Sequence, residues 1–417
     1  MSADTQVASS SPAAPSEVKE IVVSSVAEYV AELAQLDRQE GTETFYRGHA
    51  DKDWKLIPSI LRTPNGPEKE DQMFRDMVAH EPQSFSECRS ALDHLVQMQH
   101  YGHPTRLLDV TMNPLVALYF ACEETTPDLV DGLVYQFAVP EWKVKSYDSD
   151  TVSVLANLAK CKWNDIRLTL YPKLDMKGSF YDTLLNLLPI EVLRKNMLHE
   201  TVYLGISMLP RWRASGVIHL STIKNECLAK ILSSGETISE ELFISRNPYK
   251  GTGLWVDELW QGILGNGSSF HEETEYLEWL NKQKGLHILL HQIRSEKPHF
   301  LPLIQPQNLV NMFFVKAKYD NQRITNQSGA FLLFGLGLVL SSHDDMGWEV
   351  LYCDKRKVAT VPDDWIKRKF IIPKDKKEAI RKELENLGIT DSYIYPGIEQ
   401  YAKELKQRYG LEGQPEA

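Results

Sequence analysis

The chain has 417 residues, of which 42% are hydrophobic and 25% charged, so it can bury a large core without disulfides or metal ions. Its formal net charge of −11 argues against a general nucleic-acid binder, which needs a broadly basic surface. Its five cysteines are scattered and form no CxxC pair, which argues against a disulfide scaffold or a cysteine zinc site and favours a reducing compartment.

The sequence shows neither a secretory signal nor a membrane-spanning segment. Residues 1–17 are rich in serine, alanine and proline and lack the basic start and apolar stretch of a secretory signal, so we expect a disordered tail. The most apolar window, residues 329–340, is well short of the roughly 20 residues that a membrane-spanning helix needs. We therefore expect a cytoplasmic protein without membrane contact.

The first third of the chain alternates helical and strand-like patterns. Apolar spacing predicts a helix over residues 18–36, and aromatic strand formers predict a strand over 42–49. An apolar stretch broken by a proline predicts a loop over 54–62 that packs on the core. Helical spacing then predicts helices over 68–79 and 84–99.

A turn, a short strand and a buried helix are predicted next. Glycine and proline within residues 101–104 predict a turn, and the leucines at 107–108 predict a buried strand. Asn113 and Pro114 have the pattern of a helix start, with asparagine as the cap and proline at the first helical position. Residues 115–122 are apolar on all sides, which predicts a buried helix.

The remainder of the chain is predicted to be a helical insertion followed by a β-rich end of the core. Residues 132–139 favour a strand, and the region from about 144 to 281 favours helices without a repeat. Strand patterns return at 311–318 and 329–340. Further short strands are predicted at 348–353 and 370–372, and amphipathic helices at 374–387 and 397–409.

Arg47, in the tripeptide Tyr46-Arg47-Gly48, is a candidate binding residue. It lies on a predicted strand beside a glycine, where backbone can approach a ligand while the guanidinium grips a phosphate or carboxylate. An arginine held in a structural ion pair would give the same tripeptide. Taken alone, the tripeptide leaves both interpretations open.

Residues 99–114 form a second candidate segment, rich in polar and turn-forming residues and placed directly before a buried helix, which predicts the lip of a pocket. Thr111 and Asn113 lie at the positive end of that helix, where an anionic group is favoured. Asp109 has an open alternative role, in which it pairs with Arg106 and fixes the loop.

Other reactive side chains favour structural roles. His287 and His291 lie one helical turn apart, but the glutamate of the zinc-peptidase pattern is missing, so we predict no metal site. His100 and His103 are expected to shape the pocket lip, and Cys122 is expected to be a buried, inert thiol.

These blocks together resemble the FRG-domain family, which is named for a Phe/Tyr-Arg-Gly motif, here residues 46–48. The likeness continues through residues 99–109 and 113–121 and reappears at 323–331. It implies a domain over residues 18–345, interrupted by a mostly helical insertion at about 144–300, and a C-terminal extension over 346–417. The family has no single established activity and is frequent in bacteria and phages.

A more distant similarity is to mono-ADP-ribosyltransferases of the arginine, serine and glutamate class. It places Arg47 at the arginine, Asp109-Val110-Thr111 at the serine strand, Ala117 to Phe120 at the helix signature and Gln327 at the catalytic position. It implies an α+β fold in which an ADP-ribosyltransferase-like mixed β core carries a long helical insertion and C-terminal helices.

The same similarity implies a site for NAD as substrate. Arg47 would bind the diphosphate, Thr111 would position the nicotinamide half and Gln327 would face the ribose. An amide at 327 cannot accept the proton that a carboxylate would take from an acceptor, and Asp109 is the nearest substitute carboxylate. The remaining implied contacts to the nucleotide are Tyr46, Gly48, Thr105, Arg106, Asp109 and Asn113.

Two functions follow as expectations. The first is an FRG-domain protein that binds NAD or a related nucleotide and acts as an ADP-ribosyltransferase or NAD-cleaving effector in toxin or phage-defence biology. The second is a non-catalytic module that recognises a nucleotide, a nucleic-acid end or a protein partner, and Gln327 keeps it open. The helical insertion or the C-terminal extension would supply a docking surface for a protein partner.

Overall fold

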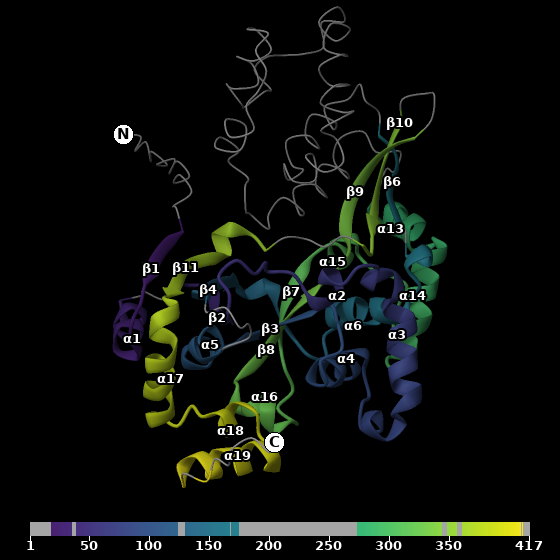
Figure 1. Cartoon of the computed structure of the whole chain (residues 1–417). Helices are drawn as coiled ribbons and strands as arrows, with labels where there is room; N and C mark the ends of the chain where they lie inside the picture. Colours follow the sequence, from purple (N-terminus) through teal and green to yellow (C-terminus); the bar gives the residue numbers. More distant parts are fainter. Residues whose placement is uncertain are drawn as a thin grey trace, which may run out of the picture.

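A computed structural model describes the fold of most of the chain (Figure 1). The predicted tail and much of the predicted helical insertion lie outside the described residues. The described residues are 18–35, 39–123, 130–166, 168–174, 273–343, 348–356, 361–409 and 411.

The core is an eight-stranded open mixed sheet with the strand order β1-β11-β4-β2-β3-β8-β7-β5. The β1–β11 and β5–β7 pairs are parallel, and the other neighbours are antiparallel. A second, three-stranded antiparallel sheet has the order β6-β10-β9 and projects from the main body. The strands are β1 (Lys19–Val22), β2 (Thr42–His49), β3 (Leu107–Thr111), β4 (Gly132–Pro140), β5 (Val144–Ser146), β6 (Leu168–Leu174), β7 (Met312–Lys316), β8 (Gly329–Phe334), β9 (Gly337–His343), β10 (Trp348–Asp354) and β11 (Ile366–Ile372).

Helices accompany the sheets along the whole described chain, so the mixed α/β architecture confirms the α+β prediction. None of the helices in the described ranges has the length and apolarity needed to cross a bilayer. The helices are α1 (Val26–Ala34), α2 (Ser59–Arg62), α3 (Gly66–His80), α4 (Ala91–His100), α5 (Pro114–Ala121), α6 (Asp150–Asn157), α13 (Glu273–Asn281), α14 (Lys284–Arg294), α15 (Pro306–Leu309), α16 (Gln322–Asn326), α17 (Lys377–Asn386), α18 (Asp391–Ile394) and α19 (Ile398–Arg408).

Two groups of helices cover one face of the main sheet and meet near β3. One group, α1, α5 and α17, packs with Tyr46 of β2 and with neighbouring side chains of β4 and β11. The other group, which includes α3, α4, α6 and α14, packs with Leu107 of β3 and with β7 and β8. Asp109 of β3 points to the same face as Leu107 but is exposed, so it lies at the seam between the two groups.

The opposite face of the main sheet carries an aromatic core. The ring of Phe314 lies 4.8 Å from Phe45, 5.7 Å from Phe137 and 6.2 Å from Trp365, measured between centroids. Arg47 lies two residues after Phe45 on β2, so its side chain leaves the strand on this same face. Arg47 and Asp109 therefore leave adjacent strands on opposite sides of the sheet.

Most predicted elements are confirmed, with exceptions at β1 and after β8. The strand over 42–49 is β2, and Asn113 caps α5 by accepting a hydrogen bond from the Leu115 amide at 2.9 Å. The helix predicted over 18–36 starts instead with β1, because residues 19–22 pair with β11. The single strand predicted over 329–340 is two strands in different sheets. The two strands are separated at Gly335, where an added Cβ would lie 2.2 Å from the Leu309 carbonyl oxygen.

The predicted insertion and C-terminal extension both contribute strands to the sheets. Within the described part of the insertion, β5 joins the main sheet and β6 the second sheet, and neither strand was predicted. Residues 175–272, predicted to be mostly helical, lie outside the described residues. From the extension, β11 lies between β1 and β4, so the C-terminal extension contributes a strand to the interior of the main sheet.

Candidate functional site

The main sheet splits between β2 and β3. Strand β2 pairs with β4 at eight positions, and β3 pairs with β8 at five, but β2 and β3 pair only at Tyr46 and Thr111. Beyond that pair, the segments Arg47–His49 and Leu107–Val110 share no further paired residue. Backbone groups along this split are therefore available to side chains and ligands.

The Arg47 side chain spans the split. Its Nε donates to Nε2 of His49 at 2.8 Å, and its Nη1 donates to the Asp109 carbonyl at 2.5 Å. His49 is fully buried, with its ring 5.2 Å from Tyr135 and 6.0 Å from Trp54. Because two of its nitrogens are held by neighbours, the guanidinium is fixed in orientation across the two strands.

The charge on Arg47 is not neutralised by an ion pair within the described part of the chain. Burial lowers the pKa of Arg47 to about 10, with Asp109 opposing the shift, so the group stays charged at neutral pH. Arg62, from α2, lies close enough to lower the pKa of Arg47 further. The two guanidinium groups therefore lie within electrostatic range of each other.

Arg62 is arranged in a similar way to Arg47. Its Nε and Nη2 donate to the Ile57 carbonyl at 3.0 and 2.8 Å, and it too forms no ion pair among the described residues. Burial lowers its pKa, and Asp109 opposes that shift. Asp109 thus acts on both arginines electrostatically without forming a salt bridge to either.

His49 stays neutral across the physiological range. Burial lowers its pKa to about 2, and the positive charges of Arg47 and Arg62 add to the effect. Because Nε2 accepts from Arg47, the proton of the neutral ring is assigned to Nδ1, which has no partner of good hydrogen-bonding geometry. A neutral histidine can accept from the guanidinium, whereas a protonated one would repel it.

This arrangement predicts a pH-dependent stability that His49→Gln removes. The folded pKa lies below the unfolded value, so the unfolded chain takes up the proton first and stability falls as the pH drops below about 6.5. The expected loss is about 1.4 kcal/mol per pH unit down to the folded pKa. Urea unfolding at pH 7, 6 and 5 should show the wild type losing its advantage over His49→Gln. Parallel curves for the two proteins would contradict the assignment, and His287→Gln, at an exposed site on α14, is the matched control.

Gly48 allows the backbone of α5 to pack closely on β2. A Cβ at Gly48 would lie 2.0 Å from the Ala117 carbonyl and 2.8 Å from the Ala121 amide. Gly132, on the neighbouring strand, meets the Ala121 carbonyl in the same way at 2.1 Å. The two glycines let the α5 backbone rest directly on β2 and β4.

Asp109 does not pair with Arg106, so that alternative is wrong. Its carboxylate accepts from Nε2 of Gln99 at 3.0 Å and remains exposed. Arg106 is buried and forms a bidentate pair with Glu70 of α3, at 2.9 and 2.5 Å, and donates to the Phe334 carbonyl at 3.1 Å. The two residues belong to different environments although they are three positions apart.

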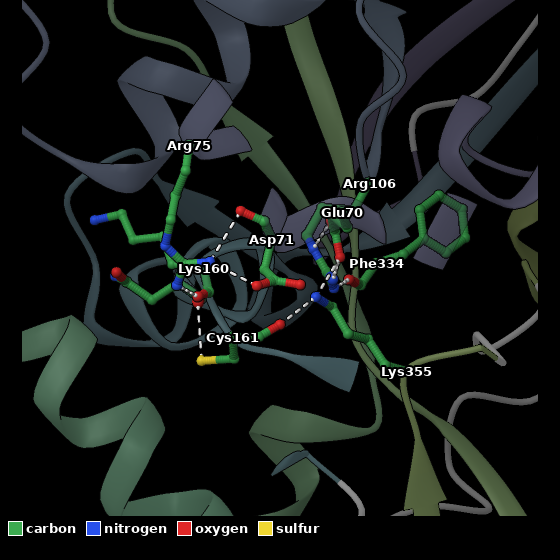
Figure 2. Close-up of polar contacts among 9 residues, drawn as sticks. Glu70, Asp71, Arg75, Arg106, Lys160, Cys161, Phe334 and Lys355 are labelled. Atoms are coloured by element: carbon green, nitrogen blue, oxygen red, sulfur yellow. Dashed lines mark hydrogen bonds and ion pairs between the residues drawn. The ribbon is translucent and has the colours of Figure 1, made fainter. Parts of the chain in front are cut away.

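Figure 2 shows that Arg106 is part of a buried ionic cluster. Nζ of Lys355, at the end of β10, lies 2.9 Å from the Glu70 carboxylate and donates to the Cys161 carbonyl at 2.7 Å. Burial raises the pKa of Glu70, but Arg106 and Lys355 outweigh it and hold that pKa at about 2. Arg106 therefore ties the segment before β3 to α3 and β10, which is a structural role.

Thr105 and Tyr46 also have internal partners. The Thr105 hydroxyl donates to the Gln99 side chain and accepts from the Leu107 amide at 3.1 Å. Its backbone amide donates to the Ser59 hydroxyl at 3.0 Å. Tyr46 is buried against the α5 side of the sheet, and its hydroxyl accepts from Gln136 at 3.4 Å. The side-chain hydroxyls of both residues are therefore held by neighbouring residues.

Thr111 and Gln327 meet in space, but through the Gln327 backbone. The Thr111 hydroxyl donates to the Gln327 carbonyl at 2.5 Å and accepts from the Asn113 amide at 2.9 Å. The Gln327 side chain donates to the Ile394 carbonyl at 3.0 Å. Among the interactions of the described residues, none joins Arg47 to either of them.

The structure adds two residues to the site, His49 and Arg62. His49 follows two positions after Arg47 on β2, and this spacing places both on one face of a strand, so the sequence held a signal for it. Arg62 lies in a stretch predicted as a loop and had no such signal. Of the other candidates, His100 stacks on Tyr101 at 5.2 Å, and burial raises the pKa of Cys122 to about 12, as expected for an inert thiol.

The comparisons with known proteins concern the first part of this site. Residues 42–128 match the model of the FRG domain, roughly a fifth of the chain. This range includes the split between β2 and β3 and helix α5, whereas Gln327 lies outside it. No curated protein and no solved structure matches the chain.

Proposed function

We propose that this chain binds NAD or a related nucleotide at the split between β2 and β3, with Arg47 and Arg62 holding the diphosphate. The observation that carries the proposal is the pair of neighbouring guanidinium groups that form no ion pair with the described residues. Arg106 is the contrast within the same domain, because Glu70 fully engages it. Two unbalanced cations match a ligand that carries two phosphate charges.

Both arginines keep part of their donor capacity for a ligand. Arg47 uses Nε and Nη1 internally, and Arg62 uses Nε and Nη2, so each retains one terminal amino group without a partner among the described residues. A phosphate oxygen is the acceptor that such groups prefer. His49 supports the site from behind, because it holds the Arg47 guanidinium without cancelling its charge.

Asp109 is assigned to the sugar of the ligand. Its exposed carboxylate is oriented by Gln99 and lies within electrostatic range of both arginines. A carboxylate repels phosphate but accepts hydrogen bonds from ribose hydroxyls. Because the two side chains leave opposite faces of the sheet, a ligand that uses both would pass through the split, with its diphosphate on the Arg47 face and a ribose on the Asp109 face.

Transfer of ADP-ribose, or cleavage of NAD, is the second candidate function. It is favoured by Asp109, since a carboxylate beside the ribose can stabilise an oxocarbenium-like transition state. The similarity to mono-ADP-ribosyltransferases, and a role in toxin or phage-defence biology, belong to this candidate. The internal hydrogen bonds of Thr111 and Gln327 favour binding without turnover, so we place binding first.

Binding is tested by calorimetric titration of the full chain with NAD. Arg47→Ala and Arg62→Ala should each weaken binding by about 10- to 150-fold, because a hydrogen bond to a charged group contributes about 1.5–3 kcal/mol. Arg408→Ala is the matched control, since Arg408 is exposed and pairs only along its own helix with Glu404. Equal affinity in Arg47→Ala and the wild type would remove Arg47 from the proposal.

Turnover is tested separately by measuring nicotinamide release from NAD. If the second candidate holds, Asp109→Asn should abolish release while NAD still binds. Saturable binding without release in the wild type would establish a non-catalytic nucleotide module. Absence of binding in the wild type would remove both functions, because each needs NAD in the split.

A further inference from the structure

Helix α19 exposes an unusual amount of apolar surface for its length. Ile398 is 87% exposed and Tyr401 49%, and Tyr409, directly after the helix, is 70% exposed. Its polar side is attached to the domain, where Glu404 accepts from the Ser392 hydroxyl of α18 and pairs with Arg408. In Figure 1 the helix lies at the edge of the molecule, below α18. The apolar side is therefore not the side that attaches α19 to the domain.

Apolar residues form one stripe along the helix, and Tyr409 continues it directly after the helix end. Ile398, Ala402, Leu405 and Tyr409 recur at intervals of four and three residues, which places them on one face. Ala402 is exposed and Leu405 half-buried. A stripe of this kind is the seam by which one helix packs against another helix.

We propose that α19 pairs with α19 of a second copy of this chain, in an antiparallel arrangement about a two-fold axis. Glu399 and Lys406 flank the same edge of the stripe but lie about 10.5 Å apart along the helix, too far to pair with each other. In an antiparallel pair the same edges of the two helices meet. Glu399 of each copy then lies opposite Lys406 of the other, so two ion pairs form across the seam.

The middle of α19 fits this arrangement. Ala402 lies halfway between Glu399 and Lys406, so the smallest side chain of the stripe falls beside the two-fold axis. A small residue there lets the helix backbones approach closely, while Ile398 and Tyr409 cover the ends of the seam. An 11-residue helix spans about 16 Å, so the interface is small and the dimer is expected to be weak.

Sedimentation velocity of the full chain at concentrations from about 1 to about 200 μM tests the proposal. The wild type should shift from monomer to dimer, and Ile398→Glu should remain monomeric throughout. Leu301→Glu is the matched control, since Leu301 is 63% exposed on a different part of the molecule, and it should dimerise like the wild type. A monomeric wild type at the highest concentration, or a dimer that survives Ile398→Glu, overturns the proposal.

Charge reversal tests the antiparallel register independently of the apolar contact. Glu399→Lys alone and Lys406→Glu alone each place like charges opposite each other and should weaken dimerisation by about tenfold or more. The double variant Glu399→Lys/Lys406→Glu restores opposite charges and should recover the wild-type affinity. If the double variant does not recover the wild-type affinity for dimerisation, the antiparallel pairing is wrong. Binding of an unrelated protein to α19 would not support the proposal.

Discussion

Replacing Glu70 with glutamine is expected to destabilise the fold by about 3–5 kcal/mol, because Arg106 and Lys355 then remain buried without a countercharge. The neutral amide keeps the size of the carboxylate, so the loss reflects charge and not a cavity. Equilibrium unfolding in urea at pH 7 measures it. A change below about 1 kcal/mol would show that the cluster in Figure 2 carries little stability.

Comparison with Lys355→Met and Arg408→Ala shows whether the loss of stability in Glu70→Gln comes from the uncompensated buried charges. Removing Lys355 leaves the bidentate Arg106–Glu70 pair neutral, so it should cost less than Glu70→Gln. Arg408→Ala removes an exposed pair within one helix and should cost about 0.5 kcal/mol or less. The pKa of Glu70 is about 2 in the fold, below its ordinary value, so its contribution is complete above about pH 4.5 and is lost as the pH falls towards 2.

Gly48→Ala is expected to be the second severe substitution, with a loss of about 3 kcal/mol. Its added Cβ would lie 2.0 Å from a backbone oxygen of α5, which cannot move aside like a flexible side chain. Helix α5 must therefore shift away from β2. Gly397→Ala is the matched control, because a Cβ there meets nothing within 4 Å, and it should change stability by no more than about 0.5 kcal/mol.

The same substitution separates two explanations of the Tyr-Arg-Gly tripeptide. If Gly48 served the approach of a ligand, Gly48→Ala would keep its stability and lose affinity for NAD. The packing of α5 predicts the reverse order, with stability lost first. Thermal unfolding and calorimetric titration on the same preparation distinguish them.

The local sequence pattern was sufficient to predict those elements that depend on interactions between neighbouring residues. Strand β2 and the Asn113–Pro114 start of α5 depend on strand propensity and capping, which act within a few residues. Residues 18–36 were predicted as a helix because Val22, Val26 and Val30 fit a helical spacing, and only pairing with β11, almost 350 positions away, makes Lys19–Val22 a strand. The break at Gly335 is set by the approach of the Leu309 carbonyl, which no local pattern records.

The candidate site was predicted in part, for a similar reason. Arg47 was identified from its motif, and the proximity of Thr111 and Gln327 followed from the family resemblance. The partner of Arg106 is Glu70, a residue 36 positions earlier on another element, and the sequence offered the nearer Asp109 instead. Arg62 comes within electrostatic range of Arg47 because α2 packs beside the segment before β3, where the Ile60 amide donates to the Thr105 carbonyl at 3.1 Å. Tertiary contacts decide which charged groups remain without a partner.

A thermodynamic cycle with two ligands tests whether Arg47 recognises the diphosphate of a nucleotide. The affinities of ADP-ribose and adenosine are measured by calorimetry for the wild type and for Arg47→Ala. Recognition of the diphosphate predicts that ADP-ribose loses about 1.5–3 kcal/mol in the variant while adenosine loses none. Equal losses for the two ligands, or no loss for either, would contradict it.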